Sequence, residues 1–186
     1  MAIKSTIFKI NLQIADMERH YYHDHALTMA QHPSETDERM MMRLLTFCLH
    51  AHEYLEFGQG MTNEDEADVW QKDLTGTIVL WIDVGMPDEK LLRKACGRAK
   101  QVMVYCYGGR TVDLWFTQNS AQFERLKNLT VINVPMESSR ALANMVQRNM
   151  QLNCSIQDGQ VWLANGDESV MIELVTLKAP HGYNHT

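Results

Sequence analysis

The segment Thr77-Ile-Val-Leu-Trp-Ile-Asp-Val84 is apolar on both faces, as expected of a central strand that is covered on each side. Gly85-Met-Pro-Asp88 ends this strand, and apolar residues at helical spacing then predict a helix from Asp88 to about Ala99. A second apolar run, from Gln101 to Tyr107, predicts another inner strand. Together the three segments form a βαβ unit, whose strands are parallel and whose crossover is right-handed.

The flanking segments extend this α/β pattern. Residues 5 to 29 alternate in patches and predict a long N-terminal β-hairpin. Ser34 can cap a helix that runs to about Tyr54 with one core-facing stripe, made of Met41, Leu44, Leu45, Cys48 and Ala51. Two further helices near 112–126 and 137–146, a strand at 130–134 and a closing hairpin turning at Asp158-Gly159 follow. We expect a single compact α/β domain over residues 1–186, with a mixed sheet around the βαβ unit and a hairpin at each end.

Composition limits the function classes. The chain has 186 residues, 45% of them hydrophobic and 22% charged, in the proportions of an ordinary globular domain. Its net charge of −6 argues against a protein that coats nucleic acid non-specifically, although a local basic groove remains compatible with it. No apolar run is long enough to span a membrane, and the N-terminus lacks the apolar region of a signal peptide. We therefore expect a cytoplasmic protein with no membrane partner.

Acidic residues form the strongest candidate site. An acid in the first turns of a helix, Asp73 before a turn and Asp83 at the end of the central strand come from three separate segments. A carboxylate beside an apolar strand needs a partner, and converging carboxylates favour a divalent cation such as Mg²⁺. Such an ion can activate water and stabilise charge on a phosphodiester. Alternatively, Asp73 forms an Asx-type turn and Asp83 accepts backbone N–H groups.

At these residues the chain resembles a known family. The matching segments are His32-Pro-Ser-Glu-Thr36, Glu38-Arg-Met-Met41, Leu80-Trp-Ile-Asp83 with Gly85 and Pro87-Asp-Glu89, Lys94-Ala-Cys96 and Ile156-Gln-Asp-Gly159. They are similar to the signatures of the YaeQ family of bacterial proteins, over nearly the whole chain. The resemblance implies a compact α/β fold built around a variant of the PD-(D/E)XK nuclease core, in a family whose biological role is not established.

The nuclease pattern assigns provisional roles to individual residues. In that pattern a helical Glu precedes an Asp, and about ten residues later an acid, one residue and a Lys follow. The interval from Asp73 to Asp83 fits, but Lys72 replaces the usual proline and Gly85 the lysine. That lysine normally orients the attacking water and supports the transition-state charge, so another residue would have to supply this cation. Lys94, on the following helix, is the first candidate to replace it.

Helical-wheel positions refine the assignment. Glu38 lies at the edge of the core stripe, whereas Glu35 points further away, so Glu38 is the better metal ligand and Glu35 the capping or solvent-facing acid. Lys94 lies opposite the apolar stripe of its own helix and can simply point to water. The same helix carries a basic ridge beside the acids, made of Lys90, Arg93, Lys94 and Arg98. This ridge could bind a phosphate backbone, or its residues could only interact favourably with the helix dipole.

Three hypotheses follow. The first is a Mg²⁺- or Mn²⁺-dependent phosphodiesterase or nuclease, with Asp73 and Asp83 binding the metal, Glu38 or Glu35 completing the shell, and Lys94 stabilising charge. The second is a catalytically silent nuclease-fold protein that binds nucleic acid or a protein partner through the basic ridge or through exposed aromatic residues such as Trp115 or Tyr107. The third is an interaction module whose acids only stabilise turns.

Overall fold

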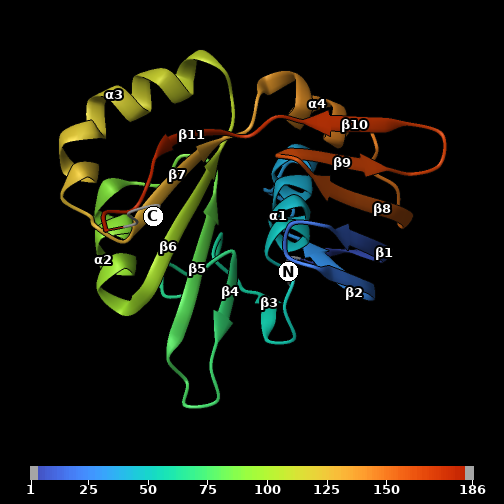
Figure 1. The fold of residues 1–186 in the computed structure, drawn as a ribbon, viewed down its shortest axis with the longest axis horizontal. Helices are drawn as coiled ribbons and strands as arrows, with labels where there is room; N and C mark the ends of the chain where they lie inside the picture. Colours follow the sequence, from blue (N-terminus) through green and yellow to red (C-terminus); the bar gives the residue numbers. More distant parts are fainter. Residues whose placement is uncertain (1–3, 183–186) are drawn as a thin grey trace.

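The computed structural model describes residues 4–182, and these form two mixed β-sheets with a helix between them (Figure 1). The larger, six-stranded sheet contains in spatial order β11 (Val175–Lys178), β7 (Leu129–Asn133), β6 (Ala99–Cys106), β5 (Ile78–Val84), β4 (Val69–Lys72) and β3 (Leu55–Phe57). Strands β5, β6 and β7 are parallel, and the strands outside them pair antiparallel. The predicted βαβ unit is confirmed by the parallel pairing of β5 with β6.

The smaller sheet joins the N-terminal hairpin to three strands between residues 149 and 172. It contains in spatial order β10 (Ser169–Ile172), β9 (Gln160–Ala164), β8 (Asn149–Gln157), β1 (Thr6–Asp16) and β2 (Tyr21–Gln31). Both predicted hairpins are confirmed, and the positive φ of Asp158 (53°) and Gly159 (76°) makes the turn between β8 and β9. The sequence indicated each hairpin separately, but not the parallel pairing of β1 with β8 that unites them.

Helices cover the larger sheet on both faces. On one face α2 (Glu89–Arg98) and α3 (Arg110–Glu124) bury Leu92, Ala95, Val112 and Phe123 against β5, β6 and β7. On the other face α1 (Asp37–His50) lies between the two sheets, and α4 (Met136–Ala143) packs beside it (Figure 1). No helix within residues 4–182 is long and apolar enough to cross a membrane.

The stripe expected to face the core is buried, but the expectation that α1 has a single buried stripe is wrong. Met40, Met41 and Met42 are consecutive, so they point in different directions, yet none is exposed. Because α1 lies between the two sheets, every residue from Met40 to Cys48 is buried, Arg43 and Thr46 included. The helix also begins later than expected, because Thr36 rather than Ser34 is the N-cap and accepts a hydrogen bond from the backbone N–H of Arg39.

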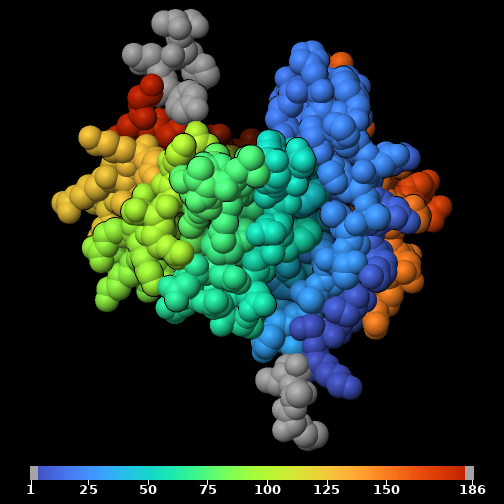
Figure 2. Space-filling model, turned by 90° about the horizontal axis from the view of Figure 1, so that it is seen from below, coloured from blue at the N-terminus to red at the C-terminus, as the bar shows by residue number. Residues whose placement is uncertain are grey.

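Viewed from below, the segment between α1 and β4 fills the space between the N-terminal hairpin and the β4–β5 hairpin (Figure 2). It includes the short strand β3 and the loop 58–67, which is rich in acidic residues. This loop closes over the start of α1 and the end of β5. It thereby encloses the charged residues described next.

Candidate functional site

The candidate site forms where β4 begins and β5 ends. The two strands are antiparallel and Val69 pairs with Ile82, so Asp68, just before β4, lies beside Asp83. The backbone N–H of Asp68 donates a hydrogen bond to Asp83 Oδ1 at 3.3 Å, and the backbone N–H of Val84 donates to Asp68 Oδ2 at 2.9 Å. The backbone of this hairpin therefore fixes two carboxylates next to each other.

Two arginines from α1 neutralise the neighbouring acids. Arg39 Nη2 donates to both carboxylate oxygens of Asp68, at 2.8 and 2.9 Å, and its Nη1 donates to Glu35 Oε2 at 2.7 Å. Arg43 holds Glu35 from the other side, with Nε 2.9 Å from Oε2 and Nη2 2.6 Å from Oε1. Glu35, Arg43 and Asp68 are buried. Because the acids are paired with fixed guanidinium groups, this network can remain ionised in the interior.

Asp83 differs from Glu35 and Asp68 because no arginine of the described residues pairs with its carboxylate. Its Oδ2 accepts a hydrogen bond from Trp81 Nε1 at 3.0 Å, but no cation pairs with it among the described residues. Burial and the neighbouring Asp68 carboxylate raise the pKa of Asp83 to about 7. At neutral pH this group is thus poised between its protonated and ionised forms. When it is ionised, Glu35, Asp68 and Asp83 exceed Arg39 and Arg43 by one negative charge.

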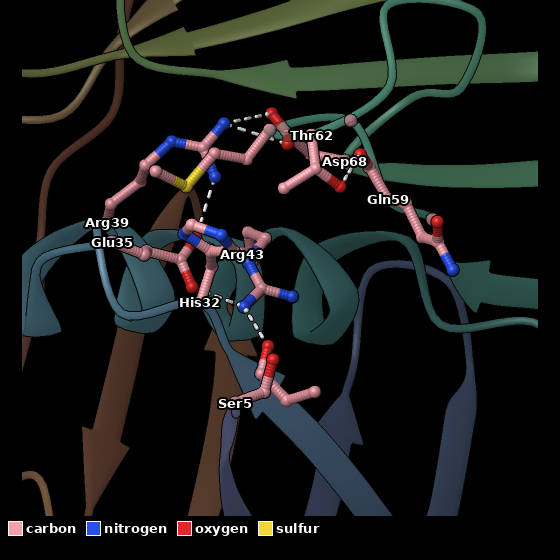
Figure 3. Close-up of a pocket in the computed structure, with 12 residues that line it drawn as sticks. Ser5, His32, Glu35, Arg39, Arg43, Gln59, Thr62 and Asp68 are labelled. Atoms are coloured by element: carbon pink, nitrogen blue, oxygen red, sulfur yellow. Dashed lines mark hydrogen bonds and ion pairs between the residues drawn. The ribbon is translucent and has the colours of Figure 1, made fainter. Parts of the chain in front are cut away.

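Two pockets flank the Arg39–Asp68 ion pair. The Asp83 pocket has a volume of about 490 Å³ and is lined by Asp83, Asp68, Glu64, Glu66, Met86 and Tyr107, among others. The Arg43 pocket, of about 280 Å³, is lined by Arg43, Glu35, His32, Ser5, Gln59 and Thr62, among others (Figure 3). Both pockets share Arg39, Gly60, Met61 and Asp68. A Cβ on Gly60 would lie 2.7 Å from Asp68 Oδ1, so the close approach of the loop requires glycine here.

The structure does not bring Asp73 and Asp83 together, so their expected juxtaposition is wrong. Asp73 lies in the turn that connects β4 to β5, at the opposite end of β5 from Asp83. Its Oδ1 accepts hydrogen bonds from the backbone N–H groups of Thr75 and Thr77 and from the Thr75 hydroxyl. These hydrogen bonds, that of Thr75 foremost, lower the pKa of Asp73. Asp73 therefore stabilises an Asx-type turn, the alternative role given above. The acid that lies beside Asp83 is Asp68.

The assignment of the two glutamates is also reversed. Glu35 precedes α1 and turns into the buried network, whereas Glu38 lies on the helix and accepts a hydrogen bond from Ser139 on α4 at 2.7 Å. The helical wheel misled because it was applied to Glu35, which is not helical. The arginines were missed altogether. One signal was present in the i, i+4, i+8 spacing of Glu35, Arg39 and Arg43, and another in the position of Arg43 within the otherwise apolar run from Met40 to Leu45.

The basic ridge lies on the surface and lines neither pocket. Lys94 Nζ donates to Asp65 at 2.7 Å, and Arg98 donates to the Asp65 carbonyl and lies over the Trp81 ring. Both residues thereby tie the acidic loop to α2. Arg93 is 3.8 Å from Glu89 on its own helix, and Lys90 is exposed. Lys94 thus pairs with Asp65 and does not line the Asp83 pocket, whereas Arg39 lines that pocket and pairs with Glu35 and Asp68.

The backbone conformation of residue 85 explains why glycine stands where the nuclease pattern has lysine. Gly85 has a φ of +95°, and its N–H donates to the carbonyl of Tyr105. We predict that Gly85→Lys lowers the free energy of unfolding by about 1–3 kcal/mol, because a side chain is strained in this conformation. Gly97→Lys is the matched control, since Gly97 lies in α2 with open space around it. Urea denaturation of both variants tests this; equal stability of the two would contradict it.

Comparisons with known proteins agree on one family. The family model described as "YaeQ protein" matches residues 1–174. The chain is 38% identical to the "Uncharacterized protein YaeQ" of Salmonella typhi and 37% identical to that of Escherichia coli K12, over 97% of this chain and 99% of each relative. The crystal structure of YaeQ from Xanthomonas axonopodis pv. citri superposes with a TM-score of 0.91 at 45% identity, covering 95% of this chain and 100% of that one. For YaeQ from Pseudomonas syringae the TM-score is 0.90 at 31% identity, covering 96% and 98%. The chain belongs to the YaeQ family.

Proposed function

We propose that the Asp83 pocket binds a divalent cation, Mg²⁺ or Mn²⁺, and that the protein is a metal-dependent phosphodiesterase acting on nucleic acid. The observation that carries the proposal is the unneutralised Asp83 carboxylate, held beside Asp68 in a pocket that solvent can enter. A cation there would relieve the repulsion between the two carboxylates and the burial of an unpaired charge. Hard divalent cations prefer such oxygen ligands.

The residues fit an ion of the Mg²⁺ type better than one that needs a full protein cage. Within residues 4–182 no group of three or more His, Cys, Asp and Glu side chains gathers for a metal. Mg²⁺ commonly uses one or two carboxylates and keeps several waters. Asp83 would be the principal ligand, since Asp68 already binds Arg39 through both oxygens. Glu64 and Glu66 line the same pocket and would hold its water molecules.

Arg39 would take the part that the lysine plays in PD-(D/E)XK nucleases. Its guanidinium is fixed on two sides, by Asp68 and by Glu35, so it is preorganised toward charge that develops at the Asp83 pocket. The bound ion would activate water and stabilise the phosphodiester charge. In this account Asp68 positions Arg39, and Asp83 holds the metal.

A second candidate function is nucleic-acid binding without turnover. The observation that favours it is that both Asp68 oxygens are occupied by Arg39, while Gly85 offers no side chain. The binding surface would then be the basic ridge, in which Arg93 and Lys90 extend toward solvent. Affinity would fall steeply with salt, because phosphate contacts release counterions.

Cleavage assays separate the two candidates. Wild type is expected to cleave at least one substrate of a DNA and RNA panel with Mg²⁺ or Mn²⁺, and Asp83→Asn to lose at least about a hundredfold in rate. Asp73→Asn, which changes the same group at the other end of β5, should cleave as wild type does. Cleavage at the wild-type rate by Asp83→Asn would reject the site. Salt-dependent binding with no cleavage by wild type would favour the binding protein.

A further inference from the structure

The Arg43 pocket has hydrogen-bond donors that find no partner within residues 4–182. Glu35 binds Nε and Nη2 of Arg43, and the Ala30 carbonyl accepts from Nη2 at 3.0 Å. Nη1 lies on the other edge of the guanidinium and has no partner among residues 4–182; it carries no dashed line in Figure 3. The Arg43 side chain is only 7% exposed, so this nitrogen belongs to a buried cation that borders a cavity.

His32 adds a second donor. Its Nδ1 accepts a hydrogen bond from the backbone N–H of Ser34 at 3.1 Å. The neutral ring therefore carries its proton on Nε2, which is left to donate. Ser5, which lines the same pocket, carries a hydroxyl that can also donate.

The acids of this pocket have little acceptor capacity left. Glu35 accepts three hydrogen bonds from the two arginines, and Asp68 accepts two from Arg39 and one from the backbone N–H of Val84. The free hydrogen-bonding groups that face the cavity are thus mainly donors. A ligand that fits them must present acceptors.

We propose that the Arg43 pocket binds a phosphoryl group through Arg43 Nη1, His32 Nε2–H and the Ser5 hydroxyl. A phosphoryl group offers several acceptor oxygens at once, and arginine is suited to it by geometry as well as charge. The volume of about 280 Å³ leaves room for the ester group attached to the phosphate. Arg39 and Arg43 are balanced by Glu35 and Asp68, so binding rests on directed hydrogen bonds and should change little with salt.

The phosphoryl group has two possible sources, a nucleic-acid strand or a free phosphate ester. The first rests on the proposed function. Because the two pockets share Arg39, Gly60, Met61 and Asp68, a strand with one phosphate at the Asp83 pocket would place its terminal phosphate in the Arg43 pocket. The site would then select the end of the strand.

Calorimetric titration with inorganic phosphate in EDTA tests the pocket itself. Wild type should bind phosphate, and His32→Ala should weaken the affinity about tenfold, the effect of one hydrogen bond to a charged group. Arg43→Lys keeps the charge facing Glu35 but removes the free guanidinium nitrogen, and should weaken binding as well. His52→Ala is the matched control, because His52 Nδ1 accepts from the backbone N–H of Tyr54 in the same local arrangement but lines neither pocket. Absence of phosphate binding, or equal losses in His32→Ala and His52→Ala, would overturn the proposal.

Oligonucleotides then identify the source. One sequence is compared with a 5′-phosphate, a 3′-phosphate and neither, in wild type and His32→Ala. If a terminal phosphate tightens binding to wild type but not to His32→Ala, the source is the end of a strand. If wild type binds the three oligonucleotides equally and still binds inorganic phosphate, the source is a free phosphate ester. Because EDTA removes divalent ions, the result does not depend on the Asp83 site. His32-dependent phosphate binding without Mn²⁺ binding would reject the proposed function and keep the phosphate pocket.

Discussion

Replacing Arg39 with alanine is expected to lower the free energy of unfolding by about 3–5 kcal/mol, the range for removing one partner of a buried ion pair. Among residues 4–182, Arg39 is the only cation paired with Asp68, and it shares Glu35 with Arg43. Without Arg39, the Asp68 carboxylate would lie beside Asp83 in the pocket with no cation paired to it. Much of the loss is the penalty for the charge left behind. The double variant Arg39→Ala with Asp68→Asn should therefore recover part of the stability.

Urea denaturation measures this effect, and Arg93→Ala is its control. Arg93 also pairs with a glutamate, but its side chain is 64% exposed and 3.8 Å from Glu89. A surface pair of this kind contributes less than about 1 kcal/mol. Similar losses in Arg39→Ala and Arg93→Ala would show that the network at the two pockets is not a stabilising unit.

Asp83→Asn is expected to alter how stability depends on pH. In the folded protein the pKa of Asp83 is raised to about 7 from an ordinary value of 3.8, so the folded state binds the proton more tightly than the unfolded state. Stability contributed by this proton is fully present below pH 4 and is lost as the pH rises toward 7. A shift of one pKa unit corresponds to about 1.4 kcal/mol. Because the carboxylate also contacts solvent, we reduce the full sum and expect the ionised group to lower the free energy of unfolding by on the order of 2 kcal/mol.

The variant removes this titration. Compared with wild type, Asp83→Asn should therefore gain stability between pH 5 and pH 8, measured by urea denaturation at several pH values in EDTA. Asp73→Asn should leave that slope unchanged, because the pKa of Asp73 is lowered and its titration falls below this range. A stability difference between Asp83→Asn and wild type that stays constant over the whole range would contradict the assignment.

Local patterns in the sequence predicted much of the fold. The β5–α2–β6 unit, both hairpins and the turn at Asp158-Gly159 are short-range features, encoded in apolar periodicity and turn chemistry. The strands β3 and β4 are only three and four residues long and carry little periodic signal. Pairing of β1 with β8 depends on residues far apart in the chain, which single-sequence patterns do not register.

The candidate site was predicted only in part, for similar reasons. Asp83 was identified because a carboxylate at the end of a buried strand is unusual. Asp68 was missed because the expected interval of about ten residues pointed to Asp73, and only the antiparallel pairing of β4 with β5 shows which acid lies beside Asp83. The role of Arg39 could not be read locally, since it depends on the placement of α1 against that hairpin.

Calorimetric titration of Mn²⁺ into wild type, Asp83→Asn and Asp73→Asn tests the central claim most directly. We predict binding to wild type and to Asp73→Asn, and no measurable binding to Asp83→Asn. Wild-type affinity should rise up to about tenfold per pH unit below pH 7, because the ion displaces the proton of Asp83. Equal Mn²⁺ affinity in all three proteins, or none in any of them, would contradict a cation site at Asp83.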